Sequence, residues 1–403
     1  MASTTYSPYS SRYQAVAGLG YDGVVRIRVG DYYGTGVLLR DGRSVLTAAH
    51  LYADIINPVA NTQIFFETIT QHKTSSLAQS VTVHPDYSSE TTGADLAIVR
   101  LSESAFLDAQ RYSIYRENDI EDQSFTIVGY GVAGTGAQGT EATASTPTRR
   151  MADNTIDGDV DLLNYYLGSE LAWHAPNGTQ FIADFDNSSY ANDAAGRLLN
   201  NAHIGVGSQE GLTTSGDSGG PALIDDEIVG IASYTASLSK GNIQPDVDDI
   251  NNSSYGEIAV WQKLSYYQEW IDKEQRAAYE NAPTKVEDVK KEVDENDTGT
   301  IYAYFLLQFT GIRTDLNQIL SVDYTTRNGT AVAGQDYIPI SDTLNLYPDE
   351  TQAVIAVEII GDSYAETDET FYLDVTNPIG GSFGEGVVTL TAMRTILNDD
   401  FIA

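Results

Sequence analysis

Residues 215–221 place a serine, Ser218, among three glycines. A serine hydroxyl becomes an effective nucleophile only when a base removes its proton. The oxyanion that forms when the hydroxyl attacks a carbonyl carbon needs backbone N–H groups aimed at it, and glycines allow the tight turn that supplies them. The segment therefore predicts nucleophilic catalysis by Ser218, with the N–H groups of Gly216 and Ser218 as oxyanion donors.

A histidine is the expected base, and His50 differs from the other four histidines in its surroundings. It follows an apolar strand-like run and two alanines, which would give a general base the rigid placement that it needs. Asp95 stands directly before the apolar run 96–101. A carboxylate there could hold the histidine in the right tautomer and stabilise its charged form. We therefore expect Ser218, His50 and Asp95 to act together.

Short β-rich runs must position these residues. Residues 24–29 alternate apolar and polar side chains after the first position, as a half-buried strand does. Residues 36–39 and 44–47 flank the turn signal Asp41-Gly42 and predict a hairpin. Short buried strands are also expected at residues 96–99, 125–128 and 228–232. The pattern predicts an all-β fold.

One helix and a charged linker divide the chain. Apolar residues recur mostly at helical spacing from residue 265 to residue 281, where Asn281 and Pro283 supply a stop. After the charged linker, strand-like runs predict an antiparallel sandwich, at residues 302–309, 319–325, 353–360, 371–375 and 387–391. We expect an N-terminal segment or propeptide (1–14), a main domain (15–282) and a β-sandwich domain (283–403).

The composition excludes several classes of function. The 403 residues include 57 acidic and 22 basic residues, and the net charge of -35 repels nucleic acid and anionic membranes. The absence of cysteine excludes disulfides, cysteine nucleophiles and thiolate metal sites. No apolar run reaches the ~18 residues of a membrane span. The first residues lack the basic and apolar parts of a secretory signal. We expect neither nucleic-acid binding nor membrane insertion.

Three segments resemble the signature blocks of chymotrypsin-like and trypsin-like serine proteases. They are residues 47–50, 95–99 and 216–221, which carry histidine, aspartate and serine in the family's order. The resemblance covers residues 15–280 and implies a double six-stranded β-barrel with a C-terminal helix. It also implies secretion and the hydrolysis of protein or peptide substrates through an acyl-enzyme on Ser218, with no cofactor for catalysis. The missing cysteines point to bacterial relatives.

The same resemblance assigns supporting roles to the strand that follows the serine. The Ser233 hydroxyl would help to hold Asp95. The backbone of Ser233, Tyr234 and Thr235 would pair with an extended substrate at the edge of the cleft.

The resemblance also predicts the floor of the primary specificity pocket, six residues before the serine. Leu212 holds that position, with Thr213 next to it. Leucine offers no charge to pair with a basic side chain, so cleavage is expected after apolar or medium-sized residues. If the alignment slips by two residues, Glu210 would form the floor and restore a preference for Arg and Lys.

In this family a newly freed N-terminal amine pairs with the aspartate that precedes the serine. Asp217 would be that aspartate, and leaving it buried without a partner would be costly. Residues 15–18 faintly resemble the usual new terminus, and Arg12 could mark a nearby processing site. The chain is therefore expected to be a precursor that is cleaved between Pro8 and Ala17.

The segment between Asp95 and Ser218 is longer than in the compact animal enzymes, and the excess is expected within residues 153–207. Asp184 and Asp186 in this segment could hold a metal ion. A solvated acidic loop is the expected state.

The C-terminal part resembles a Calx-beta domain, which is an immunoglobulin-like β-sandwich that binds calcium in some members. The resemblance rests on residues 323–337, 358–362, 366–371 and 396–400. Calcium takes ~6–8 oxygen ligands, mostly carboxylates and carbonyls. The acidic positions that match the family are Glu295, Asp336, Asp362, Asp399 and Asp400. Gly361 replaces a further acid of calcium-binding members, and the alternative role is a spacer or an adhesion module with an extracellular or cell-surface partner.

Two other functions are compatible with this organisation. One is a catalytically silent protease fold that serves as a binding or adhesion protein, which the complete set of Ser218, His50 and Asp95 argues against. The other is a quality-control protease of the HtrA kind, which the absence of a PDZ-like module argues against.

Overall fold

The computed structural model describes residues 3–70, 72–141, 147–203, 205–309, 312–313, 315 and 317–400. The chain forms two compact units. The first comprises Met1–Leu39 and Arg43–Trp270, and the second comprises Arg40–Gly42 and Ile271–Ala403. The division falls inside helix α4 (Leu264–Ala277), before the boundary near Pro283 that the sequence predicts.

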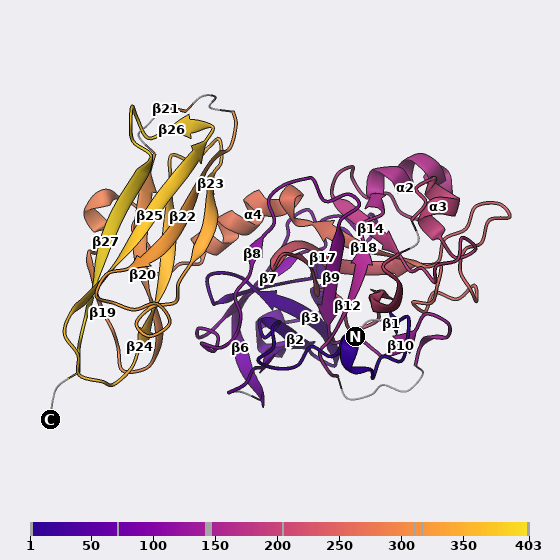
Figure 1. Cartoon of the computed structure of the whole chain (residues 1–403), viewed down its shortest axis with the longest axis horizontal. Helices are drawn as coiled ribbons and strands as arrows, with labels where there is room; N and C mark the ends of the chain where they lie inside the picture. Colours follow the sequence, from indigo (N-terminus) through magenta and orange to yellow (C-terminus); the bar gives the residue numbers. More distant parts are fainter. Residues whose placement is uncertain are drawn as a thin grey trace. The chain divides into compact units, whose positions relative to one another are not determined.

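The first half of unit 1 is a closed barrel of six strands in the order β2-β3-β4-β7-β6-β5 (Figure 1). The strands are β2 (Val24–Val29), β3 (Tyr32–Leu38), β4 (Ser44–Thr47), β5 (Thr62–Glu67), β6 (His72–Val83) and β7 (Ala97–Leu101). In β2, Val25, Ile27 and Val29 are buried and Arg28 between them is exposed. Apolar side chains at every second position therefore fill the barrel.

The second half of unit 1 is built on six longer strands in the order β12-β9-β16-β17-β18-β14. They are β9 (Ser124–Gly129), β12 (Arg150–Thr155), β14 (Gln180–Asp184), β16 (Pro221–Ile224), β17 (Glu227–Ala236) and β18 (Ile258–Lys263). The two-residue strands β13 (Gly158–Asp159) and β8 (Ser113–Ile114) pair with β14 and β17. Phe125, Phe181 and Trp261 form the aromatic centre of its core, with Phe181 and Trp261 stacked at 5.4 Å.

Short elements complete unit 1. Strand β1 (Ser3–Thr4) pairs with β10 (Gly134–Thr135) and with β15 (Gly211–Leu212), and β11 (Gly139–Thr140) pairs with β10. The helices before α4 are α1 (Pro58–Asn61), α2 (Val160–Leu167) and α3 (Ala194–Leu199). None of these three helices was predicted from the sequence. Both α2 and α3 lie in the expected excess, residues 153–207.

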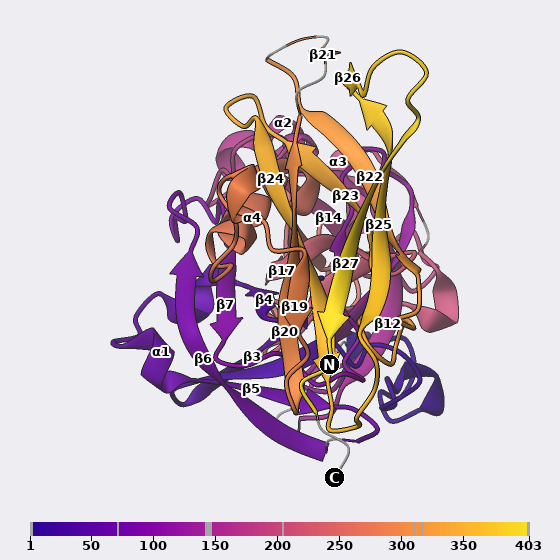
Figure 2. The same ribbon diagram turned by 90° about the vertical axis from the view of Figure 1, so that its left-hand side faces the viewer.

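Unit 2 is a β-sandwich, as the sequence predicts. One sheet has the order β19-β27-β25-β22-β23, and β20 pairs with β24 in the other (Figure 2). The bounds are β19 (Glu292–Asp294), β20 (Gly299–Gln308), β22 (Leu320–Asn328), β23 (Ser341–Leu346), β24 (Gln352–Gly361), β25 (Glu369–Ile379) and β27 (Thr389–Leu397), with β21 (Ile312–Arg313) paired to β26 (Gly381–Ser382). Phe371 stacks on Tyr337 at 4.7 Å in the shared core. The predicted all-β class, with one helix ending the first domain, is confirmed.

Candidate active site

Two neighbouring strands bring His50 and Asp95 together. Strands β4 and β7 are antiparallel, with Thr47 opposite Ala97. His50 lies in the 3₁₀ turn η2 (Ala49–Tyr52) that follows β4, and Asp95 directly precedes the segment that enters β7. His50 Nδ1 lies 2.7 Å from Asp95 Oδ2, and the backbone N–H of His50 donates to Asp95 Oδ1 at 2.8 Å. The carboxylate thus fixes both the backbone and the ring of the histidine.

Asp95 is buried and has a further donor. Ser233, in β17, donates its hydroxyl hydrogen to Asp95 Oδ2 at 2.5 Å. Gln262 Nε2 in turn donates to Ser233 Oγ at 3.3 Å. Hydrogen bonds to the charged form stabilise a buried carboxylate. The arrangement therefore fixes the Asp95 carboxylate against the imidazole of His50.

The environment of His50 shifts its affinity for protons. Burial alone lowers the pKa of His50, but the hydrogen bond and the negative charge of Asp95 outweigh that effect, so the net pKa is raised above the ordinary 6.5. A histidine with a raised pKa accepts a proton more readily. The pair of His50 and Asp95 is thus suited to general-base chemistry in its neutral-histidine form.

Ser218 lies in the tight turn between β15 and β16. Gly216 and Gly219 adopt φ values of +95° and +83°, which disfavour any side chain. The carbonyl oxygens of Gly216 and Ser218 accept hydrogen bonds from Thr35, each at 2.8 Å. Within the described residues, the N–H groups of Gly216 and Ser218 have no acceptor. Two N–H groups are therefore available where the sequence predicts an oxyanion site.

Within the described part of the chain, the Ser218 hydroxyl makes no hydrogen bond to His50. Such contacts are often long in enzymes without substrate and shorten in the reacting complex. Ser218 does line the same cavity as Ser233, whose hydroxyl holds Asp95. The three residues singled out from the sequence thus lie around one site.

A polar cavity of about 230 Å³ opens beside Ser218. Its lining carries hydroxyl and amide groups and no charged side chain, and consists of Thr140, Thr213, Thr214, Ser215, Ser218, Ala232, Ser233, Tyr234, Thr235, Asn251, Asn252 and Ser253. Four residues predicted to contact substrate are in this set: Thr213, Ser233, Tyr234 and Thr235. The segment 251–253 was not predicted, because no sequence signal connects it with Ser218.

Neither predicted pocket floor reaches this cavity. Leu212 is fully buried in the hydrophobic core and pairs with Ser3 of β1. Glu210 is also fully buried, and its carboxylate accepts the N–H groups of Asp186, Val206 and Gly207 at 2.6, 2.9 and 3.2 Å. Pairing of β15 with β1 directs Leu212 into the core, and the wall of the cavity begins at Thr213.

Asp217 is buried and receives neutral donors. Gly131 N–H donates to Asp217 Oδ1 at 2.8 Å. The N–H and the hydroxyl of Thr214 donate to Asp217 Oδ2 at 2.9 and 3.1 Å. Backbone and hydroxyl donors from Gly131 and Thr214 thus hold the Asp217 carboxylate in place.

Six acidic side chains among the described residues of unit 2 form two groups near the ends of its strands. One contains Asp336, Glu366 and Glu369, and the other contains Asp297, Asp399 and Asp400, with ligand atoms within 4.8 Å of one another in each group. Burial and nearby carboxylates, including Asp362, raise the pKa of Glu295 to about 7. Asp400 Oδ2 is buried without a hydrogen-bond partner. The oxygen donors suit a hard cation, and Asp297, Glu366 and Glu369 join the five residues predicted from the sequence.

The expectation of a solvated acidic loop around Asp184 and Asp186 is wrong. Their exposed fractions are only 2% and 1%. Asp184 ends strand β14, which is buried at every position, and Phe185 packs between the two acids in the core.

Models of known families match parts of both units of the chain. Residues 6–160, which contain His50 and Asp95, match the family model Trypsin, and residues 284–400 match the Calx-beta domain model. The chain has a trypsin-family domain followed by a Calx-beta domain. Within the described residues, no helix of either domain has the length and apolar character to span a membrane.

Individual relatives match shorter parts of the chain. The sodium/calcium exchanger Calx of Drosophila melanogaster is 36% identical over 91 residues, which are 22% of this chain and 9% of the exchanger. The human sodium/calcium exchanger 2 is 38% identical over 97 residues, or 21% of this chain and 10% of the exchanger. The chain thus spans about a tenth of the length of these relatives.

One neighbour among solved structures is neuropsin, a serine protease expressed in the limbic system of mouse brain. The comparison covers 65% of this chain and 98% of neuropsin, at 18% identity and a TM-score of 0.46.

Proposed function

We propose that the chain is a serine endopeptidase that acts through Ser218, His50 and Asp95. The observation that carries the proposal is the 2.7 Å contact between His50 Nδ1 and Asp95 Oδ2, next to the turn that holds Ser218. A carboxylate in this place orients the imidazole and stabilises its charged form during proton transfer. The free N–H groups of Gly216 and Ser218 add the expected oxyanion donors.

The reaction follows from these positions. Ser218 Oγ attacks the carbonyl carbon of the scissile bond while His50 Nε2 accepts the hydroxyl proton. The carbonyl oxygen becomes an oxyanion and accepts the N–H groups of Gly216 and Ser218. His50 then gives the proton to the leaving amine, and the acyl-enzyme on Ser218 is hydrolysed by water that His50 deprotonates. No cofactor takes part in the proposed steps.

Digestion of casein by the full chain tests this proposal. We expect hydrolysis that a serine-directed fluorophosphonate abolishes. A silent protease fold used for binding would take up no reagent at Ser218 and cleave nothing.

We propose that the cavity beside Ser218 selects an uncharged side chain. Its lining carries no charge, and burying an unpaired ammonium or guanidinium group is strongly unfavourable. In a peptide-library digest read by mass spectrometry, we expect cleavage after apolar or medium-sized residues. Glu210→Gln is the matched control and should leave this preference unchanged, because Glu210 is occupied by backbone donors. Dominant cleavage after Arg or Lys in the parent would contradict the assignment.

We propose that activity does not require a new N-terminus, contrary to the expectation from the family. In the uncleaved chain, Asp217 already accepts the N–H groups of Gly131 and Thr214. Residues 3–4 also pair with β15, next to the cavity wall. We expect full-length chain whose intact mass includes residues 1–17 to be as active as material cleaved in that region, and Arg12→Gln to have no effect. Activity that appears only after cleavage between Pro8 and Ala17 would restore the precursor model.

We propose that the Calx-beta domain binds calcium through its two acidic groups. Relatives that share this similarity include sodium/calcium exchangers, and the donor set consists of carboxylates. Millimolar calcium should slow amide hydrogen exchange in peptides covering residues 389–400, and Asp399→Asn should weaken that protection. Asp186→Asn, in the other domain, is the control and should leave it intact. Unchanged exchange in the parent would favour the spacer or adhesion role.

We infer an extracellular location from the trypsin-family domain. The protein or peptide substrates would then be met outside the cell, and the Calx-beta domain could place the protease near a surface partner. Detection of the active protein in culture medium after expression from its native gene would test the location.

A further inference from the structure

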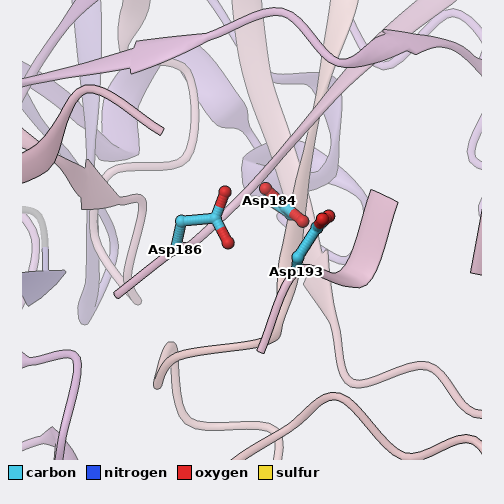
Figure 3. A group of neighbouring side chains, drawn as sticks. All are labelled: Asp184, Asp186 and Asp193. Carbon is cyan, nitrogen blue, oxygen red and sulfur yellow. The ribbon is translucent and has the colours of Figure 1, made fainter. Parts of the chain in front are cut away.

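Three buried carboxylates converge in the trypsin-family domain, away from the residues of the proposed catalytic site. Asp184 ends strand β14, Asp186 follows it, and Asp193 caps helix α3 (Figure 3). One oxygen of each carboxylate lies within 4.8 Å of the others. Their exposed fractions are 2%, 1% and 1%. The group is therefore shielded from water.

The carboxylate of Asp186 is buried without hydrogen bonds from the described residues. Neither of its oxygens has a hydrogen-bond partner among them, and neither does Asp193 Oδ2. The other oxygens are used differently: Asp184 Oδ2 accepts Ala195 N–H at 2.7 Å, and Asp193 Oδ1 accepts Gly196 N–H at 2.5 Å. A buried carboxylate without a partner is strongly unfavourable unless a proton or a cation neutralises it. The unpartnered oxygens of Asp186 and Asp193 are thus available to a ligand.

The charges of His203 and Arg197 act on Asp193, where they lower its pKa against the larger effect of burial. The Nη1 group of Arg197 donates to the carbonyl oxygens of Ala191 and Gln244, and no carboxylate of the cluster is paired with it among the described residues. His203 Nδ1 accepts the N–H of Gly205 at 3.0 Å. It lies 3.9 Å from Asp157 Oδ1, which is too long for a hydrogen bond.

Further negative groups surround the cluster. Asp157, 2% exposed, accepts the N–H of Asp184 at 2.8 Å, and Glu210 accepts the N–H of Asp186 at 2.6 Å. Burial and the charges of Asp184, Glu210 and Asp193 raise the pKa of Asp186 to about 10, and burial and the charge of Asp193 raise that of Asp184 to about 7. This repulsion is relieved when a cation enters.

We propose that Asp184, Asp186 and Asp193 bind a calcium ion. The donors are hard carboxylate oxygens from the end of a strand, the segment after it and a helix start. Calcium accepts irregular oxygen cages more readily than magnesium, which demands a regular octahedron. Zinc favours nitrogen and sulfur ligands, which the described residues of the cluster do not offer. The site is separate from the acidic groups of the Calx-beta domain.

The site also supports the wall of the cavity beside Ser218. Asn154 Nδ2 donates to the carbonyl oxygens of Asp184 and Gly211 at 2.8 and 3.0 Å. Glu210, which holds the N–H of Asp186, immediately precedes Gly211. Strand β15 then leads directly to Thr213 in the cavity lining. Bound calcium would therefore order the segment that forms the specificity pocket, a consequence that rests on the proposed protease function.

Hydrogen exchange of the full chain tests the site without any need for activity. The chain carries Ser218→Ala so that it cannot digest itself, and it is measured in EGTA, in calcium and in magnesium. Some amides of residues 184–199 should become accessible to solvent only after the ion dissociates. With free calcium at 100 times Kd, these amides should exchange about 100-fold more slowly than in EGTA. Peptides covering residues 210–215 should gain protection in parallel, and magnesium should protect less.

Asp186→Asn should remove the calcium response of residues 184–199. Because the substitution keeps the shape and removes a charge, its peptides should exchange no faster in EGTA than those of the parent. Asp297→Asn in the Calx-beta domain is the matched control and should keep the response. Equal exchange in calcium and EGTA in the parent, equal protection by magnesium, or a retained response in Asp186→Asn would overturn the proposal.

Discussion

Ser218→Ala is expected to lower kcat for peptide hydrolysis by a factor of about 10⁶, the loss seen when the nucleophile of a serine protease is removed. The residual rate would come from the oxyanion N–H groups and substrate binding, which the substitution leaves in place. The fold should be retained, because the turn around Ser218 is held by its backbone contacts with Thr35 and Ala232. The measurement is the steady-state rate on a peptide that the parent cleaves, together with the melting temperature.

Ser215→Ala is the matched control for this experiment. Ser215 lines the same cavity but has no proposed part in the chemistry. It should retain a rate within about tenfold of the parent, since a surface contact contributes little to the transition state. If Ser218→Ala cleaved at the rate of the Ser215→Ala control, Ser218 could not be the nucleophile.

Asp95→Asn should lower kcat by about 10⁴, the cost of this substitution in a Ser-His-Asp enzyme. The asparagine keeps the shape of the side chain but can leave His50 in the wrong tautomer. It also removes the negative charge that raises the pKa of His50. Protonated His50 cannot act as a base, so activity of the parent should fall as pH drops through a pKa above 6.5. In Asp95→Asn this acid limb should move to lower pH.

The pH profile of kcat/KM measures this shift directly. Ser233→Ala is the comparison variant, because it removes one donor to Asp95 and keeps the charge. It should cause a much smaller loss of rate than Asp95→Asn. An acid limb at the same pH in the parent and in Asp95→Asn would contradict the role of the Asp95 charge.

The sequence predicted those elements whose signals are local. Strand β2 has the predicted bounds, residues 24–29, because its side chains alternate between barrel interior and solvent. His50 and Asp95 were found because each adjoins a strongly apolar run, and the antiparallel pairing of β4 and β7 then places them together. Helix α4 was recognised by its periodicity, although it ends at Ala277, before the predicted stop.

The sequence could not predict features that depend on distant packing. Leu212 was assigned to the pocket by counting from Ser218, but its pairing with residue 3 turns it into the core. Asp184 and Asp186 looked like loop residues because acids are rarely buried, and only the fold encloses them. In the Calx-beta domain, Glu366 and Glu369 reach Asp336 from another part of the chain, so their shared site has no local signature.

Labelling with a fluorophosphonate, followed by peptide mapping, tests directly whether Ser218 is the activated nucleophile. The reagent forms a covalent bond only with a serine that is activated by a base and lies beside oxyanion donors. We expect one label per chain, on Ser218, in the full-length protein and no label in the Ser218→Ala variant. Failure of the folded parent chain to react, or a label on a different serine, would contradict this expectation.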